Sequence, residues 1–75
     1  MRRVGEAVRA AQGLVVVRSP DESRPDFGVR VLDENLDAVG RVVDVFGPVS
    51  RPYVAVSPDD DVRPAGLLGT KLYAR

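Results

Sequence analysis

Cysteine, histidine and tryptophan are all absent from this chain of 75 residues. Without cysteine the protein can form neither a disulfide nor a thiolate zinc site, and without histidine it cannot build a Ser-His-Asp triad. Its glycines do not have the spacing of a phosphate-binding loop, and no serine has a visible base partner. We therefore predict that the chain is not an enzyme and that it holds no metal, cofactor or small-molecule substrate.

A surplus of either charge is also absent, since 11 Lys and Arg residues balance 11 Asp and Glu residues. Proteins that bind nucleic acids on their own usually carry a basic stripe, so this balance disfavours that class. No apolar run approaches the roughly 20 residues that span a bilayer, and the opening Met-Arg-Arg lacks the apolar core of a signal peptide. We expect a cytoplasmic protein that has no membrane partner and forms one domain over residues 1–75.

The dominant residue is valine, whose β-branched side chain favours strands over helices. Turn signals separate six short segments of strand character. Residues 6–12 carry helix-forming side chains as an alternative, but this segment is short and ends at Gly13. Six strands at spacings of about 8–12 residues predict an all-β fold, a small six-stranded barrel whose closure leaves no exposed sheet edge. In the first strand, Val4 and Val8 should share one face. The predicted strands cover residues 3–9, 14–18, 28–33, 38–46, 53–57 and 70–73.

Two acidic features could indicate chemistry. Three aspartates at residues 59–61 could hold Mg²⁺, but they lie between two prolines and are more typical of a solvated loop. Asp44 lies among valines in a predicted strand. We expect it to accept hydrogen bonds from backbone N–H groups, or to pair with Arg41 or Arg51, rather than to act as a catalytic acid.

The segment over residues 38–46 does not alternate as a half-buried strand should, because both of its faces carry large apolar side chains. The odd positions are Val39, Arg41, Val43 and Val45, and the even positions are Gly40, Val42, Asp44 and Phe46. The second strand shows the same excess, with Leu14 and Val16 on one face and Val15 and Val17 on the other.

Two explanations of this apolar surplus remain open. The extra side chains could lie under a loop or be scattered over the surface, as they are on many proteins. Alternatively they form a patch that a partner covers, because large apolar patches on small domains usually mark interaction sites. A partner that covered about 800 Å² of this chain would also compensate for its small core, since a chain of this length buries only about 60% of its unfolded surface.

The connection over residues 47–52 fits the second explanation. Pro48 and Pro52 fix φ near about −65°, so the loop is stiff and loses little entropy when it docks. Gly47 can adopt a positive φ and turn the chain sharply, and Tyr53 is of a type that often anchors interfaces. The alternative is that Tyr53 belongs to the core and that the prolines only shape a hairpin.

The stretch "VGRVVDVFGPVSRPYVAVSP", residues 39–58, resembles the signature of the Gar/Naf family, the small β-barrel subunits of H/ACA ribonucleoproteins. The shared order is a glycine before a strand, an aspartate, a hydrophobic-Phe-Gly-Pro-Val turn, and Pro-Tyr ahead of an alternating strand. "RVGEAVRAAQGLVVVRS" resembles the family's opening hairpin and "LLGTKLYAR" its closing strand, so the match covers nearly the whole chain. The residues that carry the signature are Gly40, Asp44, Val45, Phe46, Gly47, Pro48, Val49, Pro52 and Tyr53.

This resemblance implies a barrel similar to that of reductase/isomerase/elongation-factor domains. It also implies binding to the pseudouridine synthase subunit of the guide-RNA complex, and the active-site aspartate belongs to that subunit. Contact with guide and substrate RNA is then only indirect. In that family the barrel influences a mobile loop of the synthase, and so assists substrate RNA loading and product release during rRNA processing and ribosome biogenesis. Eukaryotic relatives carry Gly/Arg-rich tails that this chain lacks, so the resemblance implies an archaeal-type form.

The residue pattern and the resemblance together predict a non-catalytic subunit of the H/ACA pseudouridylation complex. Two alternatives are a small RNA-binding β-barrel and an accessory barrel similar to that of translation factors. We expect the partner surface to consist of Val43, Val45, Phe46, Gly47, Pro48, Val49, Pro52 and Tyr53.

Overall fold

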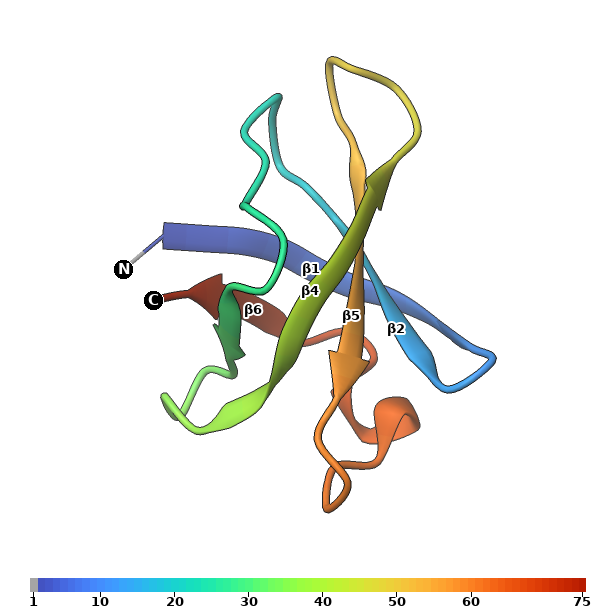
Figure 1. Ribbon diagram of the computed structural model, residues 1–75, viewed down its shortest axis with the longest axis vertical. Helices are drawn as coiled ribbons and strands as arrows, with labels where there is room; N and C mark the ends of the chain where they lie inside the picture. Colours follow the sequence, from blue (N-terminus) through green and yellow to red (C-terminus); the bar gives the residue numbers. More distant parts are fainter. Residues whose placement is uncertain (1) are drawn as a thin grey trace.

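Turns and loops divide residues 2–75, the part of the chain that the computed structural model describes, into six strands. Each strand pairs with two antiparallel neighbours in the order β1-β2-β5-β4-β3-β6, and β6 pairs back onto β1 to close the barrel (Figure 1). The predicted all-β, six-stranded barrel is therefore confirmed. The alternative helix over residues 6–12 is wrong, because β1 runs through this segment. The strands are β1 (Arg2–Ala11), β2 (Leu14–Arg18), β3 (Arg30–Leu32), β4 (Ala38–Phe46), β5 (Tyr53–Pro58) and β6 (Lys71–Ala74).

Valines fill most of the core, because alternate residues of β2 and β5 point into the barrel. Val15 is paired with Val56 and Val17 with Val54, and all four side chains are completely buried. Leu72 of β6 is buried with them. Full burial of an aliphatic side chain contributes about 1.5–3 kcal/mol, so the strand sequences "VVV" and "VAV" supply a large share of the stability.

Strand β4 does not alternate simply because it contains two β-bulges. Val39 has no partner in β3 and Val43 has none in β5, so each is the extra residue of a bulge. A bulge shifts the inward–outward alternation by one position. Val39 and Val42 are therefore both buried although they differ in parity. Val45 packs against the core and Val43 remains outside. The expectation from parity that both faces of β4 carry valines is thus wrong, because three of its four valines point into the barrel and only Val43 points out.

Two further bulges lie in β1, at Val4 against β6 and at Val8 against β2. The prediction that Val4 and Val8 share a face is wrong, because the shifts bury Val4 and leave Val8 exposed. Gly5 between them has a φ of 149°. A Cβ at Gly5 would overlap the carbonyl oxygen of Arg18, so only glycine allows β1 to approach β2 this closely.

The connection between β5 and β6 contains the 3₁₀ turn η1 (Pro64–Leu67), which brings Leu67 into the core. A single turn of this kind has no sequence periodicity, so pattern analysis could not find it. Over residues 2–75, no helix has the length and apolar character needed to cross a membrane.

Candidate functional site

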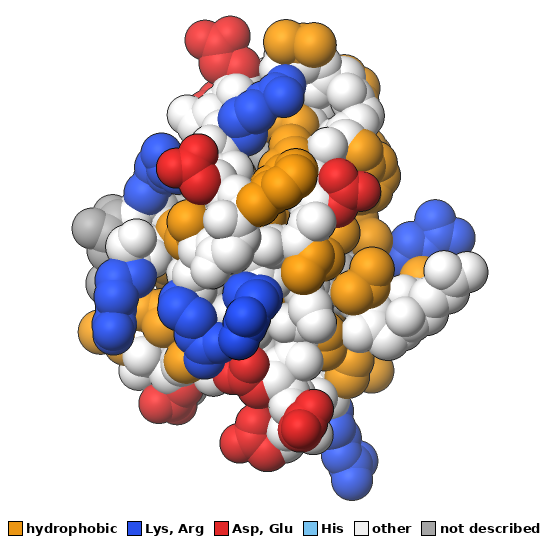
Figure 2. All heavy atoms as spheres, in the orientation of Figure 1, with side chains coloured by type: hydrophobic (Ala, Val, Ile, Leu, Met, Phe, Trp, Pro, Cys, Tyr) orange, Lys and Arg blue, Asp and Glu red, His pale blue; other side chains and the backbone are white. Residues whose placement is uncertain are grey.

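Four neighbouring strands, β1, β2, β5 and β4, carry apolar side chains on the outside of the barrel. The bulge valines Val8 and Val43 are 48% and 41% exposed, and Phe46 at the end of β4 is 44% exposed. Val49, in the loop after β4, is 74% exposed. Figure 2 shows hydrophobic side chains gathered over the β4–β5 pair and flanked by charged ones. We name the outer apolar face as the set of Val8, Val16, Val43, Phe46, Val49 and Tyr53.

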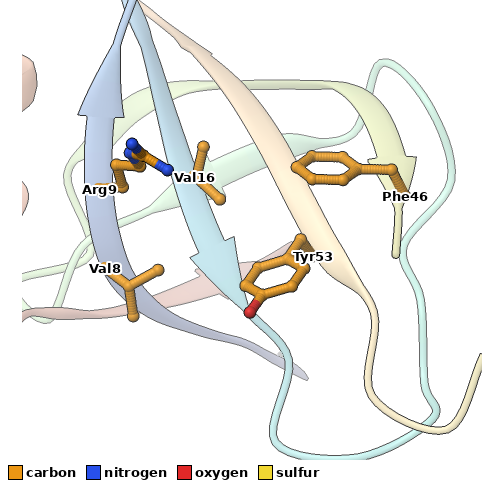
Figure 3. A pocket seen from close by; sticks show the side chains of 5 residues that line it. All are labelled: Val8, Arg9, Val16, Phe46 and Tyr53. Carbon is orange, nitrogen blue, oxygen red and sulfur yellow. The ribbon is translucent and has the colours of Figure 1, made fainter. Parts of the chain in front are cut away.

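The middle of this face is hollowed. An open hollow of about 390 Å³ is lined by Val8 and Arg9 of β1, Val16 of β2, Phe46 and Tyr53 (Figure 3). Four of the five lining side chains are apolar or aromatic, and the fifth is a cation at the margin. We call this recess the apolar hollow. A concave apolar surface of this kind can accept a protruding apolar side chain of a partner.

Tyr53 is held in place from two sides. Its ring stacks on Phe46, the residue opposite it in the β4–β5 register, with the ring centroids 5.6 Å apart and an interplanar angle of 20°. The guanidinium of Arg18, its register partner in β2, lies 5.1 Å from the ring centroid, and Nη1 of Arg18 donates a hydrogen bond of 2.9 Å to Tyr53 Oη. Stacking and cation–π contacts of this type fix the orientation of a ring. The half-buried Tyr53 is therefore a rigid part of the face.

The loop over residues 47–52 is anchored to the loop that follows β2. Ser19 N–H donates to the carbonyl of Pro52 at 3.0 Å, and Nε of Arg51 donates to the carbonyl of Ser19 at 3.0 Å. Gly47 starts the loop with a φ of 87°, where a Cβ would lie 2.8 Å from Cδ2 of Tyr53. Glycine is thus required both by the backbone conformation and by the position of the tyrosine ring. These contacts present Val49 on a fixed support.

The eight residues predicted for the partner surface lie at different depths. Five are exposed, Val43, Phe46, Gly47, Pro48 and Val49. Val45 and Tyr53 are half-buried, and Val45 packs against the core. Pro52 is fully buried. Pro52 can therefore support the loop from within but offers no surface of its own in the free chain.

Two residues of the outer apolar face are missing from the predicted set. Val16 belongs to the second strand, whose apolar excess was visible in the sequence, but nothing there placed it beside Phe46. Val8 was expected to share a face with Val4, which is buried, because a bulge at that position leaves no mark in a single sequence. Both line the apolar hollow.

The acidic residues that could indicate chemistry lie away from this hollow. Asp44 is exposed, and its Oδ1 accepts a hydrogen bond of 2.9 Å from the N–H of Val45, which confirms the expected backbone contact. Asp59 pairs with Arg30 at 3.0 Å. Among residues 2–75, no group of three or more acidic side chains is placed to hold a metal ion.

Comparison with known proteins relates the whole chain to one family. A family model described as "Gar1/Naf1 RNA binding region" matches residues 1–75. The chain is 30% identical over 71 residues to a protein of Chaetomium globosum named H/ACA ribonucleoprotein complex subunit GAR1. It is 25% identical over 71 residues to a protein of the same name from Botryotinia fuckeliana. Each alignment covers 93% of this chain, but 34% and 32% of the two relatives, so the chain spans about a third of their length.

Proposed function

The chain belongs to the family described as the Gar1/Naf1 RNA binding region, and from that premise we propose that it is a non-catalytic protein subunit of an H/ACA pseudouridylation complex. Its partner in this proposal is the pseudouridine synthase subunit. The chain contributes no chemical step and assists the loading of substrate RNA and the release of product. The two relatives are named as subunits of the H/ACA ribonucleoprotein complex, which supports the first part of the proposal.

The observation that carries the docking proposal is the outer apolar face. Soluble domains seldom leave several large apolar side chains exposed together unless a partner covers them. Here Phe46, Val43 and Val49 are between 41% and 74% exposed although the barrel is closed and its core is filled. The stiff loop and the fixed Tyr53 reduce the entropy that would be lost on docking. We infer that the synthase covers this face.

Such a subunit can influence the synthase only through differential binding. If the chain binds one state of a mobile synthase loop more tightly than another, it shifts the populations of the two states. A difference of about 1.4 kcal/mol in binding free energy changes their ratio tenfold. A rigid docking face suits this role, because a surface that adapted to both states would not discriminate between them.

The docking proposal is tested by replacing Val49 with glutamate. Val49→Glu places a charge where the partner is expected to exclude water, so the Kd for the synthase should rise at least about 100-fold in titration calorimetry. Val49 is 74% exposed, so the free chain should keep its thermal stability. Undiminished affinity of Val49→Glu would exclude this face from the interface.

A matched control is available at the far end of β4. Leu36 is 56% exposed in the turn between β3 and β4, away from the loop that carries Val49. Leu36→Glu introduces the same charge at an exposed apolar position and should leave the Kd within about threefold of the original value. An equal loss with both variants would indicate a general effect of negative charge.

Direct binding of RNA is a second candidate function. The description of the matching family names an RNA binding region, and aromatic side chains next to cations can stack on bases. This function predicts that the chain without the synthase binds single-stranded RNA with an affinity that falls steeply as salt increases. Filter binding at two salt concentrations measures this directly.

A further inference from the structure

A second, smaller hollow on the barrel surface concentrates positive charge. It has a volume of about 140 Å³, and its lining includes four cationic side chains and one anionic side chain. Four positive charges less one negative charge leave a local charge of +3, although the whole chain has no net charge. We name it the cationic hollow, and its charged members are Arg3, Glu6, Arg18, Arg51 and Lys71.

The cationic hollow adjoins the outer apolar face through one pair of residues. Arg18 lines the cationic hollow, and its guanidinium contacts Tyr53, which lines the apolar hollow. Arg51 comes from the same loop as Val49. A partner seated on the outer apolar face would therefore lie beside these cations. The two hollows form neighbouring parts of one surface.

The cations of this hollow have few partners within the chain. Across residues 2–75 the single ion pair is that of Arg30 with Asp59, outside the hollow. Glu6 is opposite both Arg18 and Lys71 in the strand registers, but forms an ion pair with neither. Nε of Arg18 is shielded from solvent and has no hydrogen-bond partner in the protein. Positive charge and donors thus remain available for an anionic group.

We propose that the cationic hollow receives an acidic side chain of the synthase when the synthase docks on the outer apolar face. This inference rests on the proposed function and adds the chemistry of the contacting segment. That segment carries an apolar side chain, which enters the apolar hollow, and a carboxylate close to it, which enters the cationic hollow. Complementary charge beside an apolar contact fixes the orientation of docking and accelerates association.

An acidic side chain fits the hollow better than an RNA strand does. Platforms for single-stranded RNA combine a basic groove along several nucleotides with aromatic faces on which bases stack. The cationic hollow is small, and the Tyr53 ring, which contacts Arg18 of the hollow, already stacks on Phe46. The recess therefore matches one anionic group rather than a polymer.

The test reverses two charges of the hollow. Arg3 in β1 and Lys71 in β6 are exposed and lie outside the outer apolar face. The double variant Arg3→Glu/Lys71→Glu should raise the Kd for the synthase about tenfold or more in calorimetry at low salt. The affinity of the unaltered chain should fall as salt increases, and the variant should have lost most of this dependence.

The control carries the same change in charge elsewhere. Arg63 and Arg75 are exposed and line neither hollow. The double variant Arg63→Glu/Arg75→Glu should leave the Kd within about threefold of the original, and thermal melting should show that both double variants fold. Surface Asp and Glu residues of the synthase can then be changed to Lys one at a time. The change that restores binding to Arg3→Glu/Lys71→Glu, but not to the other chains, identifies the acidic residue that enters the hollow.

Four outcomes would overturn the inference. Equal losses in the two double variants would mean that only net charge matters. Undiminished binding of Arg3→Glu/Lys71→Glu would mean that no acidic group enters the hollow, while docking itself stands. Single-stranded RNA that binds the free chain and loses affinity only with the hollow variant would assign the hollow to phosphates. If the unaltered chain does not bind the synthase at all, the proposed function fails first, and the inference with it.

Discussion

At the scale of single residues, the position of Tyr53 depends on a glycine six places before it. Gly47 has a φ of 87°, and the space that its side chain would occupy is filled by the Tyr53 ring. The ring in turn contacts Phe46 and Arg18. A change at Gly47 would therefore strain the turn and disturb the meeting point of the two hollows.

We predict that Gly47→Ala lowers the free energy of unfolding by about 1–3 kcal/mol, because the new Cβ is both strained and crowded. Urea unfolding of the free chain measures this change. Gly66→Ala is the matched control, since a Cβ at Gly66 has no neighbour within 4 Å, and should change the stability by no more than about 0.5 kcal/mol. Similar values for the two variants would mean that neither the positive φ of Gly47 nor the Tyr53 ring constrains the turn.

At the scale of elements, β4 serves two surfaces through its bulges. Val42 is 1% exposed and belongs to the core, whereas the adjacent Val43 is 41% exposed on the outer apolar face. In a regular strand, the side chain at position 44 would point to the same side of the sheet as Val42. Because Val43 is an extra residue, the alternation shifts by one position, and Val45 packs against the core instead. The bulge allows one strand to fill the barrel and still present apolar side chains outside.

This division predicts opposite results for two neighbouring valines. Val42→Ala should destabilise the free chain by about 2 kcal/mol, because it removes buried methyl groups and leaves a cavity. Val43→Ala should stay within about 0.5 kcal/mol of the original stability but weaken binding to the synthase. Urea unfolding and calorimetry on the same two variants measure both effects. A larger loss of stability with Val43→Ala would contradict the placement of the bulge.

At the scale of the whole molecule, a small barrel with an exposed apolar face should gain stability if the proposed partner covers that face. A chain of this size buries only about 60% of its unfolded surface, so its own core is limited. A partner that binds only the folded chain stabilises it by mass action, by about 2.7 kcal/mol at a concentration 100 times the Kd.

We therefore predict that the synthase at 100 times the Kd slows amide exchange in β2 and β5 of the isotopically labelled chain about 100-fold. These strands hold four of the five valines that are 0% exposed and should exchange only when the whole barrel opens. The Val49→Glu variant under the same conditions should show little protection. Equal protection of both chains would mean that docking does not use the loop after β4.

The strand-forming valines and the turn residues were sufficient to predict an all-β barrel of six strands, because both signals are local. The same local signals located β2 and β4 at their observed bounds. Parts of the partner surface could also be anticipated, since an apolar Phe-Gly-Pro-Val turn between two strands has few ways to be buried. The exposure of Phe46 and Val49 agrees with that expectation, while their role in docking stays a prediction.

The assignment of valines to the two sides of the barrel needed the coordinates. A bulge is a mismatch between two paired strands, so it depends on the register of a partner that lies far away in the chain. For this reason Val4 and Val8 lie on different sides of the barrel, while Val39 and Val42 both point inward. Pro52 is buried where its carbonyl accepts a hydrogen bond from Ser19, which lies far from it in the chain. The cationic hollow likewise joins residues from both ends and the middle of the chain, and its charges come together only when the barrel closes.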